Sequence, residues 1–271
     1  MTIRPVRIAL QLQPQHADYR QIRRTVAQAE DLGVDALFTW DHFFPINDGG
    51  GPVTRATGQH FECWTMLAAW AESTSRVQLG PLVTCNAYRN PDLLADMART
   101  VDHISDGRLI LGIGSGWFDR DFLEYGYEFA SDRRRLDDLA AALPRIERRW
   151  SLLSPPPTRR IPVLIGGAGE RRTLPLVARH ADIWHCFGEP ALVAHKRRVL
   201  GEHCAALGRD LDDIEVSSAV AGGPTPPGEP EELGRPLRDA GVSLFTVGIG
   251  GPDYDLAPLR RWLTWRDEEN G

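Results

Sequence analysis

The chain has 271 residues, of which 42% are hydrophobic and 25% are charged. This composition lies well away from the weakly hydrophobic, highly charged sequences that stay disordered. The formal net charge of −6 argues against a nucleic-acid or anionic-membrane partner. The N-terminus lacks the basic and then apolar order of a signal peptide, and no apolar run reaches the roughly 18 residues of a membrane span. We therefore expect a cytoplasmic protein.

The cysteine and histidine patterns predict no metal site. The four cysteines are widely spaced and include no CxxC pair, so neither a zinc site nor a disulfide framework is indicated. A metal-dependent hydrolase built on a barrel would carry a histidine pair at the end of its first strand, where this sequence has Gln11 and Gln13. Lys196 is the only lysine among 31 basic residues, and the scattered arginines favour a GC-rich genome as the cause.

Short apolar runs alternate with longer amphipathic stretches, which is the pattern of repeated βα units. The expected strands are residues 6–12, 35–40, 77–83, 108–114, 162–167, 182–187, 214–220 and 243–249. The expected helices are residues 18–32, 62–73, 91–105, 132–150, 171–180, 190–207, 231–240 and 256–266. Gly33 suits the end of the first helix, and Pro91 suits the first turn of the third. Eight such units predict a closed (β/α)8 TIM barrel, formed by residues 1–271 as a single domain.

In such a barrel the loops after the strand C-termini build the active site. Two irregular stretches, residues 43–61 and 221–230, follow expected strands and should lie on this face. Asp41 and His42 come directly after the second strand. A histidine can transfer protons near neutral pH, and a nearby carboxylate can fix its tautomer. From position alone, an ordinary hydrogen-bonded loop pair is an equally good interpretation.

The next two strands end in residues that offer a ligand mainly backbone. The third ends in "GPLVTCNAYRNP", with Thr84 and Asn86 as its polar candidates. The fourth ends in "GIGSGW", where Gly112, Gly114 and Gly116 would let a ligand approach the main chain closely. Tight packing between strand and loop would require the same glycines, so both interpretations stay open.

The fifth expected strand leads through "GGAGERRTL" directly into a helix. Its glycines expose backbone, and Arg171 and Arg172 stand at the helix start. Free N–H groups at a helix start stabilise negative charge by roughly 0.3–2 kcal/mol, and arginine adds a bidentate donor. This arrangement predicts a phosphate site, with a plain glycine turn as the alternative.

Four segments, "DHFF", "LGPLVTCNAYRNP", "ISDGRLILGIGSGW" and "PVLIGGAGERRTL", together resemble the bacterial luciferase-like monooxygenase superfamily. They are most similar to its branch of deazaflavin (coenzyme F420)-dependent oxidoreductases. The resemblance runs from Ile8 to about Ile249 and implies a luciferase-like barrel that transfers hydride between F420 and a small organic substrate, as a homodimer. Two alternatives are an FMN monooxygenase, supplied with reduced flavin by a partner reductase, and a non-catalytic flavin- or deazaflavin-binding barrel.

The resemblance also implies the site residues. Asp41 and His42 would lie beside the cofactor ring as the catalytic residues, with His42 as the acid/base partner of the substrate. Leu82 and Val83 would flank a non-prolyl cis peptide bond whose bulge meets the face of the ring. The other cofactor contacts would come from Thr84, Asn86, Gly114, Ser115 and Gly116 along the ring and ribityl chain, and from Gly166, Gly167, Gly169 and Arg172 at the phosphate.

The position of that cis bond is a sharp prediction. Energy alone would place it at Gly80–Pro81, because X–Pro bonds become cis at about 0.5–1 kcal/mol against about 3–4 kcal/mol for other bonds. We nevertheless expect Leu82–Val83 to be cis and Gly80–Pro81 to be trans, because a bulge at the strand end would push backbone towards the ring.

Overall fold

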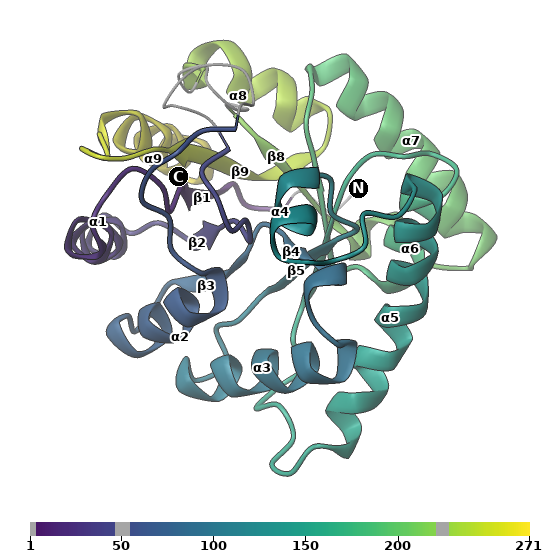
Figure 1. Ribbon diagram of the computed structural model, residues 1–271. Helices are drawn as coiled ribbons and strands as arrows, with labels where there is room; N and C mark the ends of the chain where they lie inside the picture. Colours follow the sequence, from purple (N-terminus) through teal and green to yellow (C-terminus); the bar gives the residue numbers. More distant parts are fainter. Residues whose placement is uncertain (1–3, 47–54, 221–227) are drawn as a thin grey trace.

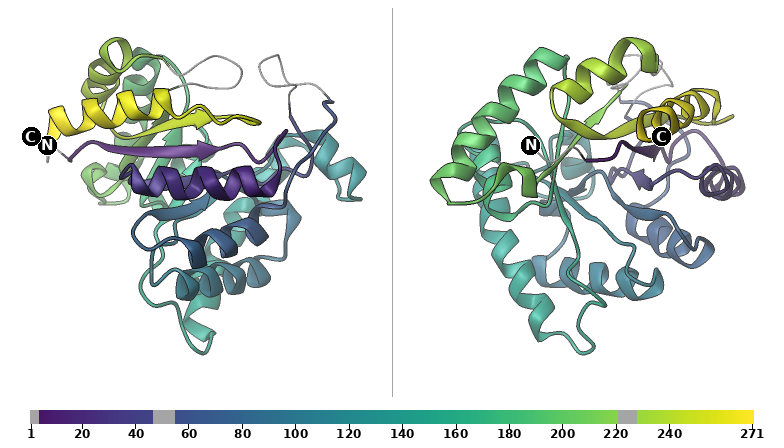
Figure 2. Two further views of the ribbon diagram at one scale, coloured as in Figure 1. Left: turned by 90° about the vertical axis from the view of Figure 1, so that its left-hand side faces the viewer. Right: turned by 180° about the vertical axis from the view of Figure 1, so that it is seen from behind.

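The computed structural model describes residues 4–46, 55–220 and 228–271. Parts of the two irregular stretches singled out above, residues 47–54 and 221–227, therefore lie outside the described residues. The described chain forms one parallel sheet of nine strands in the order β3-β2-β1-β9-β8-β7-β6-β5-β4, and helices surround it (Figure 1). All described strands point the same way, with both chain termini at the opposite end from the loops that follow the strands (Figure 2).

The elements follow the predicted alternation. The strands are β1 (Arg7–Leu12), β2 (Ala36–Thr39), β3 (Gln78–Pro81), β4 (Thr84–Cys85), β5 (Leu111–Gly114), β6 (Val163–Gly166), β7 (Ile183–Cys186), β8 (Glu215–Ala219) and β9 (Val242–Ile249). The α-helices are α1 (Tyr19–Asp31), α2 (Cys63–Ser73), α3 (Pro91–Ile104), α4 (Asp119–Glu124), α5 (Asp132–Leu152), α6 (Thr173–His180), α7 (Pro190–Ala206), α8 (Pro230–Asp239) and α9 (Ala257–Asn270). Two short 3-10 helices are η1 (Asn86–Tyr88) and η2 (Leu211–Asp213). None of the described helices is both long enough and apolar enough to cross a membrane.

β3 and β4 are two halves of one barrel strand: β3 lies within the third expected strand, residues 77–83, and β4 begins directly after its predicted end. The peptide bond Leu82–Val83 between them is cis, whereas Gly80–Pro81 is trans, so both predictions are confirmed. Both halves lie along β5 and the residues before it: the amide of Ile110 donates to the carbonyl of Leu79 at 2.8 Å, and β4 pairs with β5. The nine strands therefore occupy eight positions around the ring, and the predicted (β/α)8 barrel is confirmed.

Local sequence signals set several helix ends. α1 begins at a capping box in which Asp18 accepts from the amide of Gln21, and it ends just before Gly33, whose φ is +81°. α3 begins with Pro91 after Asn90, whose side chain accepts from the amide of Asp92 at 2.9 Å.

Three helices differ from the prediction. α9 runs to Asn270, four residues beyond its predicted end. α6 begins at Thr173 instead of residue 171, because the amides of Thr173 and Leu174 both donate to the carbonyl of Gly169 and close a turn first. The short helix α4, between β5 and α5, was not predicted. Its six residues are too few to show an apolar period, and its N-cap residue Phe118 offers no side-chain acceptor.

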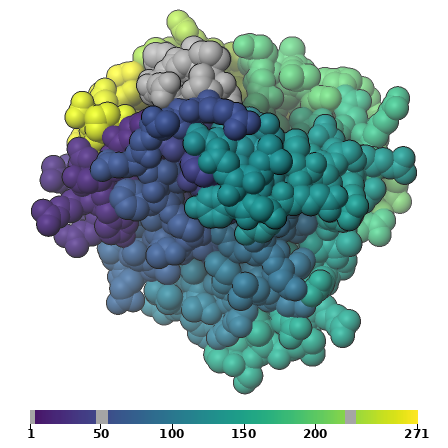
Figure 3. Space-filling model, in the orientation of Figure 1, coloured from purple at the N-terminus to yellow at the C-terminus, as the bar shows by residue number. Residues whose placement is uncertain are grey.

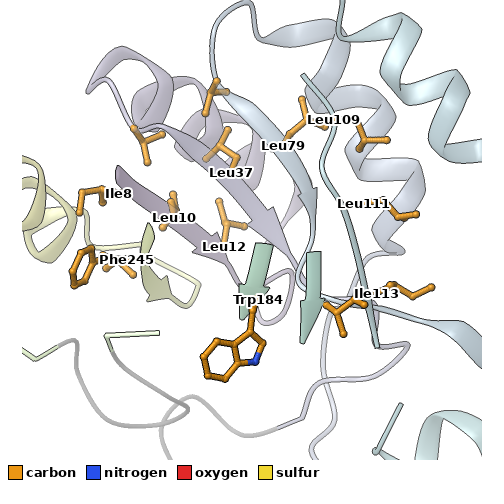
Figure 4. Packing of buried hydrophobic residues seen from close by; sticks show 14 of the residues in the cluster. Ile8, Leu10, Leu12, Leu37, Leu79, Leu109, Leu111, Ile113, Trp184 and Phe245 are labelled. Carbon is orange, nitrogen blue, oxygen red and sulfur yellow. The ribbon is translucent and has the colours of Figure 1, made fainter. Parts of the chain in front are cut away.

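Two apolar layers hold the barrel together. Alternate strand residues such as Ile8, Leu10 and Leu37 point outwards and pack under the helices (Figure 4). The residues between them fill the barrel interior, where the cluster consists of Ala9, Ala36, Phe38, Leu82, Ile110, Leu164, Ile183 and Leu244.

The backbone before the bulge leaves no room for a side chain at Gly112 of β5, and this gives a test of the fold. A Cβ at Gly112 would overlap the carbonyl oxygen of Pro81, which is backbone and cannot move aside. We expect Gly112→Ala to lower the free energy of unfolding by roughly 3 kcal/mol or more, measured by urea denaturation. Gly201→Ala in α7 is the control, because a Cβ there meets only the end of the Leu211 side chain at 3.3 Å. Equal stability of the two variants would contradict the packing described here.

Candidate active site

The cis bulge lies between β3 and β4 and is held by hydrogen bonds from the ends of β2 and β1. The amide of Leu82 donates to the carbonyl of Thr39 at 2.7 Å, at the end of β2. The side-chain amide of Gln11, from the end of β1, donates to the carbonyl of Leu82 at 3.0 Å. These bonds fix the bulge against β1 and β2, so the segment that follows β2 lies beside it.

The predicted glycines of β5 and β6 make room for the bulge and for the chain after it. A Cβ at Gly114 would stand 2.8 Å from a methyl group of Val83, and one at Gly166 would stand 3.2 Å from the other. Gly116 has φ +81°, and its Cβ would lie 2.5 Å from the sulfur of Cys85. Packing thus accounts for these three glycines. A cofactor contact at Gly114, Ser115 or Gly116 stays a prediction.

Asp41 ties the end of β2 to the segment after the bulge. Its carboxylate is buried, with only 2% of the residue exposed. It accepts from the hydroxyl of Thr84 at 2.5 Å, from the amide of Cys85 at 3.3 Å, and from two N–H groups of Arg89 at 2.6 and 3.1 Å. Both oxygens are therefore engaged, and this geometry favours a structural tie over a proton-transfer role for Asp41.

His42 has a different carboxylate as its partner. Its Nδ1 lies 2.6 Å from Oδ2 of Asp121, which is fully buried in α4. Asp121 also accepts from the amide of Phe43 and from the hydroxyl of Tyr88, both at 3.0 Å. Burial, helped by the neighbouring carboxylate of Asp121, raises the pKa of Tyr88 well above its ordinary value, so that hydroxyl keeps its proton and donates it.

These contacts fix the tautomer of His42. An ionised carboxylate only accepts hydrogen bonds, so the proton shared with Asp121 sits on Nδ1 of His42. Nε2 then carries the lone pair, and it makes no hydrogen bond within the described part of the chain. Asp121 stabilises the imidazolium that forms when Nε2 takes a proton, which is the logic of the histidine–aspartate pair in hydrolases. The sequence analysis missed Asp121, because it lies on the short helix that shows no period.

α4 covers the barrel mouth and is tied to the segment after β2. Arg120 donates to the carbonyl of Ala56 at 2.6 Å and lies 4.0 Å above the ring of Phe44. The space-filling view shows α4 beside this segment on the same face (Figure 3). These contacts hold Asp121 at a fixed distance from His42.

The turn between β6 and α6 retains the features of an anion site. Gly167 has φ +121°, and its amide donates to the carbonyl of His185 on β7. The amides of residues 168–171 have no acceptor within the described ranges, so four N–H groups remain available. The carboxylate of Glu170 is turned away towards α7, where it accepts from Lys196 at 2.7 Å.

The two arginines of this turn differ. Arg172, the predicted phosphate ligand, forms an ion pair with Asp137 of α5. Arg171 is exposed and forms no ion pair with any residue that the structure describes. The sequence analysis did not predict this ion pair, because Asp137 lies 35 residues before Arg172 and nothing next to Arg172 indicates such a partner.

Three buried polar side chains near the bulge have an atom without a partner in the described chain. They are Oγ1 of Thr39, at the end of β2, Oδ1 of Asn86, in η1, and Nε2 of His185, on β7. His185 is in register with Gly166 and donates to or accepts from Ser217 at 2.9 Å through Nδ1. Burial lowers the pKa of His185 to about 3, so it is neutral at physiological pH. The sequence analysis placed His185 within a strand and did not single it out.

Comparison with known proteins fits this geometry. The family model described as luciferase-like monooxygenase matches residues 2–222. The chain belongs to the luciferase-like monooxygenase family. Members that it resembles include an F420-dependent glucose-6-phosphate dehydrogenase of Amycolatopsis mediterranei (strain U-32), 32% identical over 49% of this chain and 38% of the relative. Another is a phthiodiolone/phenolphthiodiolone dimycocerosates ketoreductase of Mycobacterium bovis (strain BCG / Pasteur 1173P2), 25% identical over 84% of this chain and 67% of the relative.

The match covers only 38% to 57% of the length of the first curated family members. Among solved structures, an F420-dependent secondary alcohol dehydrogenase in complex with an F420–acetone adduct superposes with a TM-score of 0.81. It is 16% identical over 96% of this chain and 98% of that one. The FMN-bound oxygenating constituent of 3,6-diketocamphane monooxygenase from Pseudomonas putida gives 0.73 at 14% identity, over 98% of both chains. At these identities the likeness shows the fold alone.

The neutral His185 gives a testable pH dependence. Its folded pKa lies below the ordinary value near 6.5, so below that pH the unfolded chain binds a proton that the folded barrel does not. Stability is therefore lost as the pH falls. Between pH 7 and pH 5 this histidine should lower the free energy of unfolding by about 2 kcal/mol. The substitution His185→Gln should remove this pH-dependent loss of stability, measured by urea denaturation at pH 7 and at pH 5.

The control for this experiment is His195→Gln, whose side chain is 47% exposed. A stability difference between wild type and His185→Gln that stays the same at pH 7 and pH 5 would contradict the prediction.

Proposed function

We propose that this protein is an oxidoreductase that binds coenzyme F420 across the C-terminal face of the barrel and transfers hydride between it and a small organic substrate. The observation that carries the proposal is the pairing of His42 with the buried Asp121 next to the cis bulge. It provides one proton-transfer atom, Nε2 of His42, at the barrel mouth. The names of the family members described above support F420 as the cofactor.

The residues present fit a phosphate-bearing tricyclic cofactor. The bulge at Leu82 and Val83 offers backbone in place of a long side chain at the centre of the mouth. The free amides of residues 168–171 suit a phosphate, with Gly166, Gly167, Gly169 and an arginine beside them. The unpartnered Oδ1 of Asn86 is a buried acceptor that a ligand N–H could satisfy.

The protein itself orients the cofactor and the substrate and transfers a proton to or from the substrate. When bound, coenzyme F420 supplies or accepts the hydride. In oxidation of an alcohol, Nε2 of His42 takes the hydroxyl proton, and in reduction of a carbonyl it returns that proton. Asp121 keeps Nδ1 protonated and stabilises the charged ring. Asp41 and Thr84 do not transfer protons themselves. Their hydrogen bond positions His42 by holding its segment against the chain that follows the bulge.

The proposal includes the cytoplasm as location and a homodimer as assembly. Light scattering that gave twice the chain mass of 30.2 kDa would support the dimer. FMN chemistry with a partner reductase is the rival within the same fold, and a non-catalytic cofactor-binding barrel is the rival outside catalysis.

Cofactor titration tests the proposal directly. Quenching of cofactor fluorescence should show saturable binding of F420 and weak binding of FMN. Arg172→Ala should weaken F420 binding in a salt-sensitive way, whereas phosphate-free deazaflavin should bind both forms alike. Asp137→Ala releases Arg172 from its ion pair and should strengthen F420 binding, while Arg198→Ala on α7 should change nothing. Tight binding of FMN without F420 would favour the flavin monooxygenase.

Variants of the histidine–aspartate pair test the mechanism. His42→Ala should leave F420 affinity nearly unchanged and lower the rate of hydride transfer by roughly 10²–10⁴. Asp121→Asn should lower the rate towards the same level, because an amide can fix the wrong tautomer of the ring. The control is Asp119→Asn on the same helix, where the side chain is half exposed and 3.8 Å from Arg55. An unchanged rate in His42→Ala would remove His42 from the mechanism.

A further inference from the structure

The surroundings of His42 are aromatic. Trp40, Trp117 and Phe118 lie edge-on to its ring, with centroids 5.5–5.8 Å away. Trp40 and Phe118 are 7% and 5% exposed, so their surfaces are already covered. Trp117 is 52% exposed. A rigid indole with half its surface uncovered, edge-on to the ring of His42, is a surface on which an apolar ligand can pack.

The arginines around the mouth are already engaged. Arg120 is held by Glu124 at 2.7 Å as well as by its contacts after β2. Arg89 is held by Asp41 and Glu62, and Arg135 by Asp132 at 2.6 Å and the carbonyl of Gly116 at 3.2 Å. Arg55 is 64% exposed and lies within 3.9 Å of two acidic side chains. No free cation therefore faces His42 within the described residues.

The acidic side chains of α4 are engaged as well. Asp121 faces Nδ1 of His42, Glu124 accepts from Arg120 at 2.7 Å, and Asp119 lies 3.8 Å from Arg55. An anionic group brought to the mouth would therefore lose its hydration without a free counter-ion among the described residues.

We propose that the substrate is an uncharged alcohol, or the carbonyl compound formed from it, whose apolar body packs against Trp117. The inference rests on the proposed function, in which the free amides before α6 hold the cofactor phosphate and are not available to the substrate. Oxidation moves a hydride from carbon to F420 and a proton from the hydroxyl to His42, which leaves a carbonyl. This substrate differs from the charged sugar phosphate that appears in the name of the Amycolatopsis relative.

A matched pair of substrates tests the charge requirement. Cyclohexanol and 4-hydroxycyclohexanecarboxylate share a ring and a reacting hydroxyl and differ in one negative charge. With F420-loaded protein, we expect kcat/KM for cyclohexanol to be at least about 100-fold higher, and glucose 6-phosphate to give no turnover. Binding is measured separately by ligand NMR with cyclohexanone and 4-oxocyclohexanecarboxylate, so that a slow chemical step cannot hide it.

Variants of Trp117 test the packing surface. Trp117→Ala should raise KM for cyclohexanol and Kd for cyclohexanone about tenfold, with kcat and F420 affinity nearly unchanged. Trp117→Phe should restore most of the affinity, because it keeps a ring. Leu123→Ala is the control, since Leu123 is 59% exposed on the same face and makes no ring contact with His42.

The outcomes separate the two proposals. If F420 does not bind in the fluorescence titration, the proposed function fails. If F420 binds and the carboxylate binds or reacts as well as its neutral partner, the substrate inference fails and the function stands. The inference also fails if cyclohexanone does not bind up to its solubility limit, or if Trp117→Ala leaves both KM and Kd unchanged.

Discussion

The packing of Val83 determines how the segments of the barrel mouth are arranged. Its side chain contacts β5 and β6 at glycines, where these strands have no Cβ. The third barrel strand breaks there, and glycine at positions 112, 114 and 166 is what lets the bulge fit inside the ring. Hydrogen bonds between Leu82 and both Thr39 and Gln11 then hold the bulge at the ends of β2 and β1. Because Thr84 follows directly and donates to Asp41, the segment that bears His42 takes its position from the same packing.

Two buried carboxylates next to one another in space do different work. Asp41 faces Arg89 and two donors of the strand after the bulge, so its charge is compensated within the fold. Asp121 faces His42, with only neutral donors besides it among the described residues. Its charge therefore faces the imidazole ring of His42. Asp41 is not the partner of the histidine that follows it, because Thr84, Cys85 and Arg89 already engage both of its oxygens.

The sequence predicted the barrel well because eight periodic units leave little choice of topology. It also located the bulge and the residues around it through the family resemblance. It did not find Asp121 or His185. Asp121 sits on six residues without a period, and a lone histidine inside an apolar strand looks like any core residue. The partner of Arg172 could not be predicted either, because the ion pair with Asp137 joins two helices that meet only in the folded barrel.

The arginine-rich composition has a structural consequence at the end of the barrel opposite the mouth. Arg108 donates to the carbonyls of Ala71 and Thr74 and so caps the C-terminal end of α2, and Arg209 does the same for Ala178 and Ala181 at the end of α6. A planar fork suits such paired carbonyls better than an ammonium group does. Arginines fixed in this way cannot turn towards a ligand. In the proposed function, the main-chain amides before α6 would meet the cofactor phosphate, and the aromatic rings beside His42 would meet the substrate.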